Sequence, residues 1–278
     1  MKRALVAGLL GWLCLSFVPS LGAQEASGFF RFKQERGDYS KGVALRWADP
    51  DNLGQSKLGV VLAAKALDAT RGQGEMEPLD AVTADLGFGE VYLKLTLGET
   101  EDGIRIEHLF SSPGGFNTSG NGEEKISIAG GRIKGSWKLP PTEFFDDTYE
   151  ADISFDLPLV DLKDPGKPLA AGGGEPGKAY AAYIAALAKG DIEAIKSALG
   201  ESGGWRFSWL ESDHDKARAL EEEALHKPVK VTVLGGWEDG DRAMIRIEGP
   251  GRLGGKFTGR VMMQREGGAW KVASQELK

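Results

Sequence analysis

Apolar and polar residues alternate in short runs over residues 29–161, and glycine-rich turns separate the runs. In the clearest run, Leu93, Leu95 and Leu97 alternate with Lys94 and Thr96. Such alternation predicts strands with one face in a core and the other in water. Eight runs fit: residues 29–34, 43–47, 58–63, 91–97, 104–110, 125–129, 132–138 and 149–157. They predict an antiparallel β-sandwich or open barrel, with one short helix at residues 79–86.

The spacing changes to three and four residues within residues 176–200. Apolar residues keep this spacing up to Gly190 and Asp191 and resume it beyond them, which predicts two consecutive helices. Gly190 suits a left-handed cap, and Asp191 can accept hydrogen bonds from the amides of the second helix. Ser212 and Asp215 predict the capped start of a third helix, which ends before Pro228. Four strand-like runs follow, at residues 229–234, 242–248, 256–264 and 270–275.

This order predicts an α+β protein with two domains, the first built of strands and the second of three helices followed by strands. The stretch 164–177 is mostly proline, glycine and alanine and predicts a flexible linker. The predicted division is a signal peptide at 1–23, an antiparallel β domain at 24–163, the linker at 164–177 and an α+β domain at 178–278. A chain of 278 residues is long enough for two cores.

The first 23 residues have the pattern of a secretion signal. Lys2 and Arg3 precede an apolar run, and Ala23 offers a small residue at the cleavage point. The apolar run is shorter than the roughly 20 residues that span a bilayer, so we expect no stable membrane insertion after cleavage. Cys14 lies inside the run and is the only cysteine, so the mature chain lacks disulfides and thiolate ligands. We therefore expect export to the periplasm or the extracellular space.

The chain carries a formal charge of −7, which disfavours nucleic acid as a partner because nucleic acid binding requires basic patches. We also expect no metal and no cofactor. Asp213, His214 and Asp215 are neighbours in the first turn of a helix. Acids at this position are explained by their favourable interaction with the helix dipole, without a metal ion. The acidic run Glu221–Glu223 predicts a solvated helix face. The excursion 111–124 is rich in glycine but lacks the lysine of a phosphate-binding loop.

The last 100 residues resemble the nuclear transport factor 2-like superfamily. The residues that carry this resemblance are A-Y-I-A-A-L-A-K-G-D-I-E-A-I at 182–195 and G-G-A-W-K-V at 267–272. The resemblance implies a cone-shaped fold in which a curved sheet wraps around the leading helices. Members of the superfamily act as isomerases, small hydrolases, ligand carriers or interaction modules, so the resemblance does not select a function. The first domain resembles strand-rich modules of exported bacterial proteins, without any chemistry attached.

Strand parity tests the isomerase option, which requires carboxylates that point into the cone. If the apolar face points inward, the lining contains no ionisable side chain: Val229, Val231, Val233, Ala243, Ile245, Ile247, Phe257, Gly259, Val261, Met263, Trp270 and Val272. Arg246, Glu248 and Arg260 have the opposite parity. Isomerase chemistry is therefore disfavoured, although a β-bulge could exchange the faces. In the first domain, His108 has the apolar parity of Ile106 and predicts a core histidine.

Polar groups inside the cone must then come from the helices or from the aromatic segment that follows them. The candidate ligand-binding residues are Tyr180, Tyr183, Trp205, Trp209 and His214, and we identify no catalytic residue. The favoured hypothesis is non-catalytic binding of a small apolar ligand or of a protein partner in the cell envelope. One alternative is an isomerase or hydrolase with its active site in the cone. Another is an assembly module that forms a homodimer through the C-terminal sheet.

Overall fold

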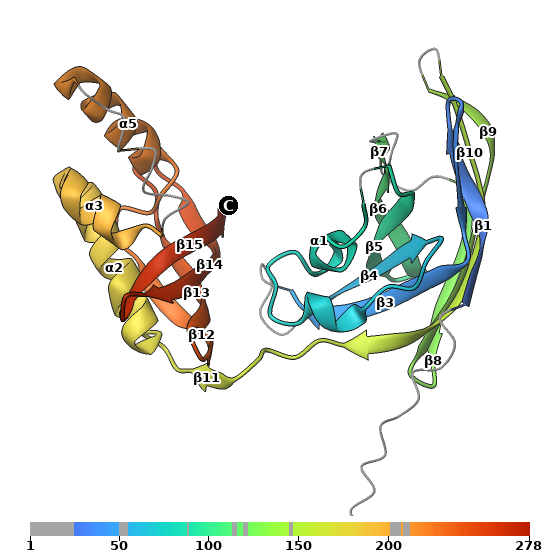
Figure 1. Ribbon diagram of the computed structural model, residues 1–278, viewed down its shortest axis with the longest axis horizontal. Coiled ribbons are helices and arrows are strands. Elements are labelled where there is room, and N and C mark those ends of the chain that lie inside the picture. Colours follow the sequence, from blue (N-terminus) through green and yellow to red (C-terminus); the bar gives the residue numbers. More distant parts are fainter. Residues whose placement is uncertain are drawn as a thin grey trace, which may run out of the picture.

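The computed structural model describes residues 25–49, 55–87, 89–112, 116–118, 122–144, 147–200, 207 and 212–278. The predicted signal peptide, with Cys14, and the candidates Trp205 and Trp209 lie outside the described residues. The chain is a mixed α+β structure made mostly of strands, and its two sheets are open rather than closed into a barrel (Figure 1). Among the described helices, none is long and apolar enough to cross a membrane.

The first half of the chain forms a ten-stranded sheet in two groups of strands. One group contains β1 (Glu25–Phe32), β2 (Glu35–Tyr39), β8 (Glu123–Ala129), β9 (Arg132–Phe144) and β10 (Asp147–Asp161). The other contains β3 (Lys41–Ala48), β4 (Ser56–Ala63), β5 (Tyr92–Thr100), β6 (Gly103–Ser112) and β7 (Phe116–Thr118). The groups enclose a core that includes Phe30, Leu95 and Trp137. All eight predicted strands are present, and β2 and β7 are additional.

The long strand β10 joins the two groups. It pairs with β1 and β9 in the antiparallel sense, and its last residues pair with β3 in the parallel sense, Leu159 opposite Ala44. The prediction of a purely antiparallel domain is wrong at this pairing, because β10 is long enough to leave one group and enter the other. The opposite face of β3 and β4 is covered by η1 (Ala69–Gly72) and α1 (Pro78–Thr83), which bury Leu45 and Val61.

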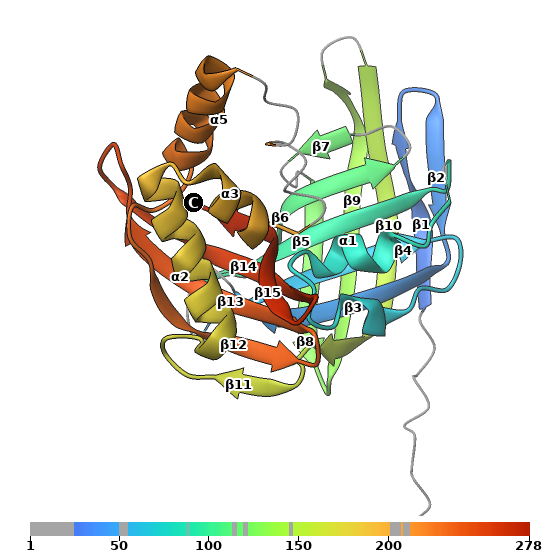
Figure 2. The same cartoon turned by 60° about the vertical axis from the view of Figure 1, so that its left-hand side comes forward.

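The second half forms a five-stranded sheet in the order β11-β12-β13-β14-β15. Its strands are β11 (Lys167–Leu169), β12 (Thr232–Asp239), β13 (Arg242–Pro250), β14 (Lys256–Glu266) and β15 (Ala269–Leu277). The helices α2 (Gly174–Lys189), α3 (Ile192–Ala198) and α5 (Asp213–Leu225) belong to this half, and α2 and α3 cover one face of the sheet (Figure 2). We call this face the inner face.

The inner face has the predicted parity over most of its length. Ile245, Ile247, Val261 and Met263 are buried there against the helices. The predicted caps are also present, since Gly190 adopts a left-handed conformation and the Asp191 side chain accepts a hydrogen bond from the Ala194 amide. Both caps provide hydrogen-bond partners for backbone groups at the helix ends that would otherwise have none.

The segment 164–177 is more ordered than the predicted flexible linker. Lys167–Leu169 form the strand β11, which pairs with β12, and α2 already begins at Gly174. Gly177 approaches the Gly172 carbonyl so closely that a Cβ atom would lie 2.1 Å from its oxygen. The glycines that suggested flexibility therefore permit close packing of the backbone.

Four β-bulges or register shifts occur among the described strands, and three of them change which way a residue of interest faces. One lies opposite Thr96 and Leu97 in β5, so that His108 pairs with Thr96 while Ile106 pairs with Leu97. As a result His108 is exposed, and the prediction of a core histidine is wrong. The other two bulges lie in the second sheet, after Val233 in β12 and after Val272 in β15. A bulge inserts one residue and thereby reverses the parity of those that follow.

Candidate binding site between the two sheets

Tyr180 and Tyr183 of α2 are both fully buried against the inner face, and their ring centroids lie 5.8 Å apart. The Tyr180 hydroxyl donates to Gln275 Oε1 at 3.1 Å, and the Tyr183 hydroxyl lies 2.8 Å from Glu223 Oε1. Burial is the main cause that raises the pKa of both phenols above its ordinary value, and the charge of Glu223 adds to it. The two predicted residues are thus brought together, but their hydroxyls already have protein partners.

The inner face therefore contains a polar network that strand parity did not predict. Gln275 reaches it because of the bulge in β15, which turns Gln275 inward and Ser274 outward. Glu223 extends from α5. Its side chain is 14% exposed and forms an ion pair with Lys227 at 3.3 Å. The prediction that the whole run Glu221–Glu223 is solvated is wrong for Glu223, because its position on the helix points it toward α2.

His214 does not belong to this network. Its side chain is 86% exposed in the first turn of α5 and lies 3.7 Å from Asp215. It precedes Glu223 by nine residues, or about 13 Å along a helix. Asp215 instead takes part in the predicted cap of α5. The Ser212 hydroxyl donates a hydrogen bond to the Asp215 carboxylate, and this hydrogen bond is the main cause that lowers the Asp215 pKa. Among the described residues, no group of three His, Cys, Asp or Glu side chains could hold a metal ion.

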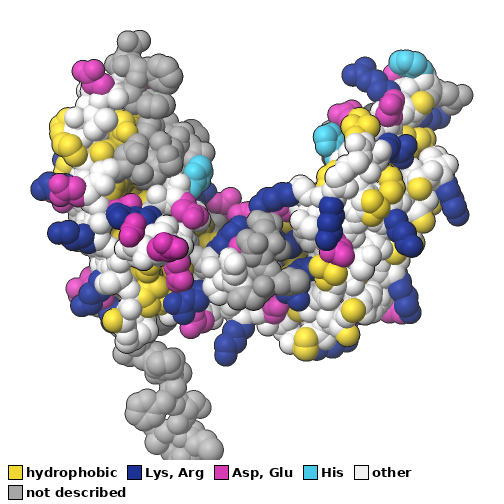
Figure 3. Space-filling view, turned by 180° about the vertical axis from the view of Figure 1, so that it is seen from behind, with side chains coloured by type: hydrophobic (Ala, Val, Ile, Leu, Met, Phe, Trp, Pro, Cys, Tyr) yellow, Lys and Arg dark blue, Asp and Glu magenta, His cyan; other side chains and the backbone are white. Residues whose placement is uncertain are grey.

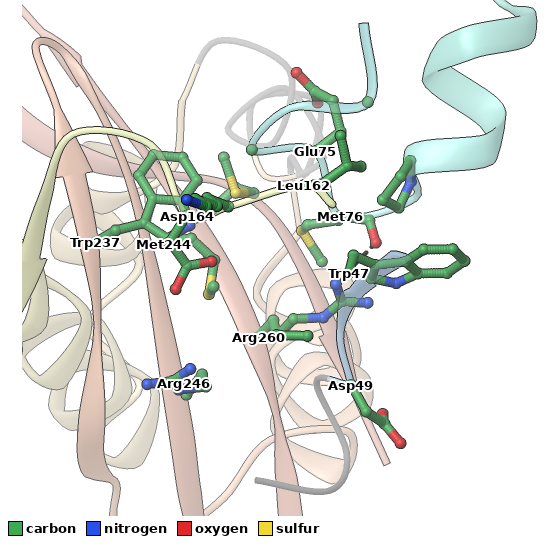
Figure 4. A pocket seen from close by; sticks show the side chains of 16 residues that line it. Trp47, Asp49, Glu75, Met76, Leu162, Asp164, Trp237, Met244, Arg246 and Arg260 are labelled. Carbon is green, nitrogen blue, oxygen red and sulfur yellow. Dashed lines mark hydrogen bonds between the residues drawn. The ribbon is translucent and has the colours of Figure 1, made fainter. Parts of the chain in front are cut away.

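The other face of the sheet, which we call the outer face, carries a pocket that the two halves build together (Figure 4). Trp47, Met76 and Leu162 line it from the first half, and Trp237 and Arg246 line it from the second. Trp237, Met244 and Met262 form a small buried cluster, against which Met76 packs. The cavity has a volume of about 50 Å³. In the space-filling view, the surface between the two halves is hollowed, and acidic and basic side chains lie along its floor (Figure 3).

Residues 73–77, which connect η1 to α1, hold the halves together at this pocket. The buried Arg260 side chain donates to the Met76 carbonyl oxygen at 2.8 Å, and Arg242 pairs with Glu75 at 2.9 Å. The Ser274 hydroxyl donates to the Met76 sulfur at 3.4 Å. Cation, carboxylate and main-chain contacts therefore fix the connecting segment 73–77 on the outer face.

Arg260 is surrounded by two carboxylates. Glu276 accepts from its guanidinium at 2.5 Å, and Glu77 lies 3.7 Å away. Burial is the main cause that raises the Glu77 pKa, and the neighbouring charge of Glu276 adds to it. Two acids that share one buried guanidinium thus repel each other, while Arg260 gains an anionic partner on each of two chain segments.

The remaining acids of the pocket differ in their partners. Asp49 is 9% exposed and lies 3.6 Å from Lys57. Asp164 is an exposed residue of the lining and has no ion-pair partner among the described residues. Arg246 has a buried Nε with no hydrogen-bond partner within the described part of the chain. The lining thus combines apolar side chains with charged ones, and Arg246 Nε is its buried donor without a described partner.

Sequence reasoning missed this pocket for two reasons. Trp237 has inward parity if β12 is read as regular, and only the bulge turns it outward beside Met244. Its sequence signal is the pair Gly235 and Gly236, since isolated glycines in a strand often mark bulges. The approach of Met76, which lies about 160 residues earlier in the chain, has no local signal at all.

The comparisons with known proteins do not identify a family. No family model matches the chain, and no curated protein sequence matches it. One solved structure, a SEC-C motif containing protein from Rhodopseudomonas palustris, is 22% identical over 37% of this chain and 77% of its own, with a TM-score of 0.29. Another, an NTF2-like protein involved in plasmid conjugation, is 11% identical over 87% of this chain and 78% of its own, with a TM-score of 0.24. Similarity at this level supports no functional argument.

Proposed function

We propose that this chain is an exported, non-catalytic binding protein that holds a small, largely apolar ligand between its two halves. The observation that carries the proposal is the pocket on the outer face, where side chains of both sheets surround one cavity. Two tryptophans supply rigid apolar walls, and three methionines supply adaptable ones. This lining is typical of binding sites that combine an apolar interior with a few polar groups.

The size of the cavity limits the ligand. Pockets for drug-sized molecules measure about 300–1,000 Å³, whereas this cavity measures about 50 Å³. The ligand is therefore a molecule of a few heavy atoms, or the end group of a larger molecule that enters from the mouth. The fixed position of Met76 keeps the cavity small, because Arg260 holds its carbonyl oxygen.

Native mass spectrometry of the mature chain, purified from its own envelope fraction, tests the proposal. We expect a bound small molecule in the wild type and its loss in Met262→Phe, which fills the cavity. Leu253→Phe is the matched control, because Leu253 is 86% exposed and does not belong to the lining. Absence of any bound molecule, or a co-purified protein that Met262→Phe does not release, would contradict the proposal. The same spectrum measures the oligomeric state and so tests the predicted homodimer.

A second candidate function is an enzyme that uses the polar network on the inner face. The observation that favours it is the contact of Tyr183 and Lys227 with the same oxygen of the half-buried Glu223. An acid that is partly shielded from water beside a lysine and a phenol can transfer protons. Hydrolysis of a p-nitrophenyl ester that disappears in both Glu223→Gln and Tyr183→Phe, but persists in Glu222→Gln, would support this candidate. Equal activity in all three variants would exclude it.

The nuclear transport factor 2-like fold of the second half remains part of the proposal. The order of three helices before an antiparallel sheet, with the helices against one face, is consistent with it. In such a cone the ligand is expected inside, whereas the pocket described above lies on the opposite face. The fold and the site are therefore separate proposals and can fail separately.

A further inference from the structure

The outer face carries a row of residues that lie directly opposite one another on four neighbouring strands. Gly235 of β12 pairs with Arg246 of β13, Arg246 pairs with Arg260 of β14, and Arg260 pairs with Glu276 of β15. We call these four residues the charged row. It places two guanidinium groups opposite each other, an arrangement that destabilises a sheet unless other groups compensate the charge.

Within the part of the chain that the structure describes, only Arg260 has partners that compensate its charge. Arg260 contacts Glu276, Glu77 and the Met76 carbonyl oxygen. Arg246 has neither a hydrogen bond nor an ion pair with any described residue, and its Nε is buried. A buried donor without a partner destabilises the folded state, and the cost is greater when the donor belongs to a charged group. Such a cost is typical of a site where a ligand supplies the missing partner.

The end of the charged row beside Arg246 borders the cavity, which provides the space for that partner. The Gly235 position provides none, because a Cβ atom there would lie 3.7 Å from a guanidinium nitrogen of Arg246 and 2.9 Å from the Leu169 carbonyl oxygen. Arg246 also lines the cavity together with Trp237 and Met244. In the close-up view it lies apart from Arg260, on the side of the pocket nearer to Trp237 and Met244 (Figure 4). An anionic group can thus reach Arg246 while an apolar body contacts the tryptophan and the methionine.

The acids of the pocket do not fill this role. Asp49 is next to Lys57, and Glu75 is paired with Arg242. Asp164 is exposed and does not reach Arg246 within ion-pair distance. As an exposed carboxylate of the lining, Asp164 disfavours ligands with more than one negative charge.

We propose that Arg246 determines the specificity of the pocket by binding the carboxylate of a small apolar monocarboxylate. This inference rests on the proposed function of the pocket. A guanidinium presents two parallel N–H groups to the two oxygens of a carboxylate, and a buried pair of this kind is stronger than a neutral hydrogen bond. The apolar chain of the ligand lies against Trp237, Met244 and Met262.

A titration followed by tryptophan fluorescence tests the inference, because Trp47 and Trp237 line the cavity. The probes are linear carboxylates from acetate to octanoate, the alcohols of equal length, and inorganic phosphate, all at pH 7. We expect the best carboxylate to bind the wild type at least tenfold more tightly than its alcohol or phosphate. Arg246→Met lowers the affinity for that carboxylate at least tenfold and leaves the alcohol unchanged. Arg246→Lys retains the charge without the paired donors and gives an intermediate loss.

The exposed Arg252, in the connection that follows β13, provides the matched control. Arg252→Met also removes one positive charge but does not alter the lining of the pocket. Its affinity for the carboxylate stays within twofold of the wild type. Arg246→Met folds with an unchanged or higher melting temperature, because the opposition of two arginines is relieved. A melting temperature lowered by the substitution would contradict the claim that Arg246 lacks a partner.

The outcomes separate this inference from the function on which it rests. Equal affinity for carboxylates and alcohols, in the wild type and in Arg246→Met, overturns the role of Arg246 but keeps the pocket as a binding site. Tighter binding of phosphate overturns the carboxylate class. If none of the probes changes the fluorescence of any variant, both the inference and the proposed function are overturned.

Discussion

The two faces of the five-stranded sheet are formed by the same strands but carry different chemistry. The inner face is filled by aliphatic side chains such as Ile245 and Val261, and its polar network is satisfied by partners on α2 and α5. The outer face carries Arg246 and Arg260 on neighbouring strands, next to a cavity that a segment of the other half closes. The same alternation of residues thus produces a closed core on the inner face and a contact with a remaining cavity on the outer face.

This comparison shows where binding chemistry can be placed in an α+β half of this kind. A face packed against its own helices has little unsatisfied polarity, because folding itself selects for complete pairing of buried groups. A face packed against a separate half meets it through fewer and more polar contacts, as interfaces between domains generally do. Arg246, whose buried Nε has no hydrogen-bond partner among the described residues, is on that second face. The comparison can be tested by substitutions on each side.

The largest effect is expected for Ile245→Ala on the inner face. Ile245 is fully buried in the core, and its truncation leaves a cavity that the packed helices cannot close. We expect a loss of about 3–4 kcal/mol in the free energy of unfolding, measured by urea titration. The adjacent Met244→Ala changes the outer face, where a cavity already exists, and we expect a smaller loss of about 2 kcal/mol. Equal losses would show that the two faces are packed alike.

A smaller effect is expected for Arg260→Met, which removes the contact between the outer face and the connecting segment 73–77. The charge-assisted hydrogen bonds to Met76 and Glu276 are lost, and the expected cost is about 2 kcal/mol. Amide hydrogen exchange should rise in residues 73–77 and remain unchanged in α2. Arg265→Met is the control, because Arg265 is 36% exposed and its acidic partners lie 3.5 Å away. Unchanged exchange in residues 73–77 would argue against Arg260 as the link.

Much of the fold could be predicted from the sequence, because alternation and helical spacing are local signals. Ile245 and Tyr180 were expected on the inner face, and both are there. The bulges could not be placed in the same way, since they depend on how neighbouring strands match in length and twist. Three of the bulges each moved one group of interest: they exposed His108, turned Gln275 inward and turned Trp237 outward.

The pocket on the outer face could not be predicted from the sequence for a different reason. It requires Met76 to lie against Met244 and Met262, and no pattern in a single sequence encodes contacts between segments so far apart. Strand parity predicts Arg246 and Arg260 on the face opposite the apolar lining, and both lie there. The sequence of the second half alone gives no indication that this face is covered. Burial of Arg260 follows only when the first half covers it.

The smallest effect is expected for Glu77→Gln, which tests the electrostatics of the outer face. The Glu77 pKa is raised above its ordinary value of 4.5 by burial and by Glu276, so the folded state binds a proton more tightly than the unfolded chain. The stability that Glu77 contributes is present below pH 4.5 and is lost as the pH rises through the raised pKa. Glutamine does not titrate, so the melting temperature of Glu77→Gln minus that of the wild type should increase between pH 4 and pH 7. The increase is small because the Glu77 side chain is 64% exposed and solvent screens its charge. A difference that decreases with pH would mean that the attraction of Arg260 outweighs the repulsion of Glu276, and the charged row would then be better compensated than its geometry indicates.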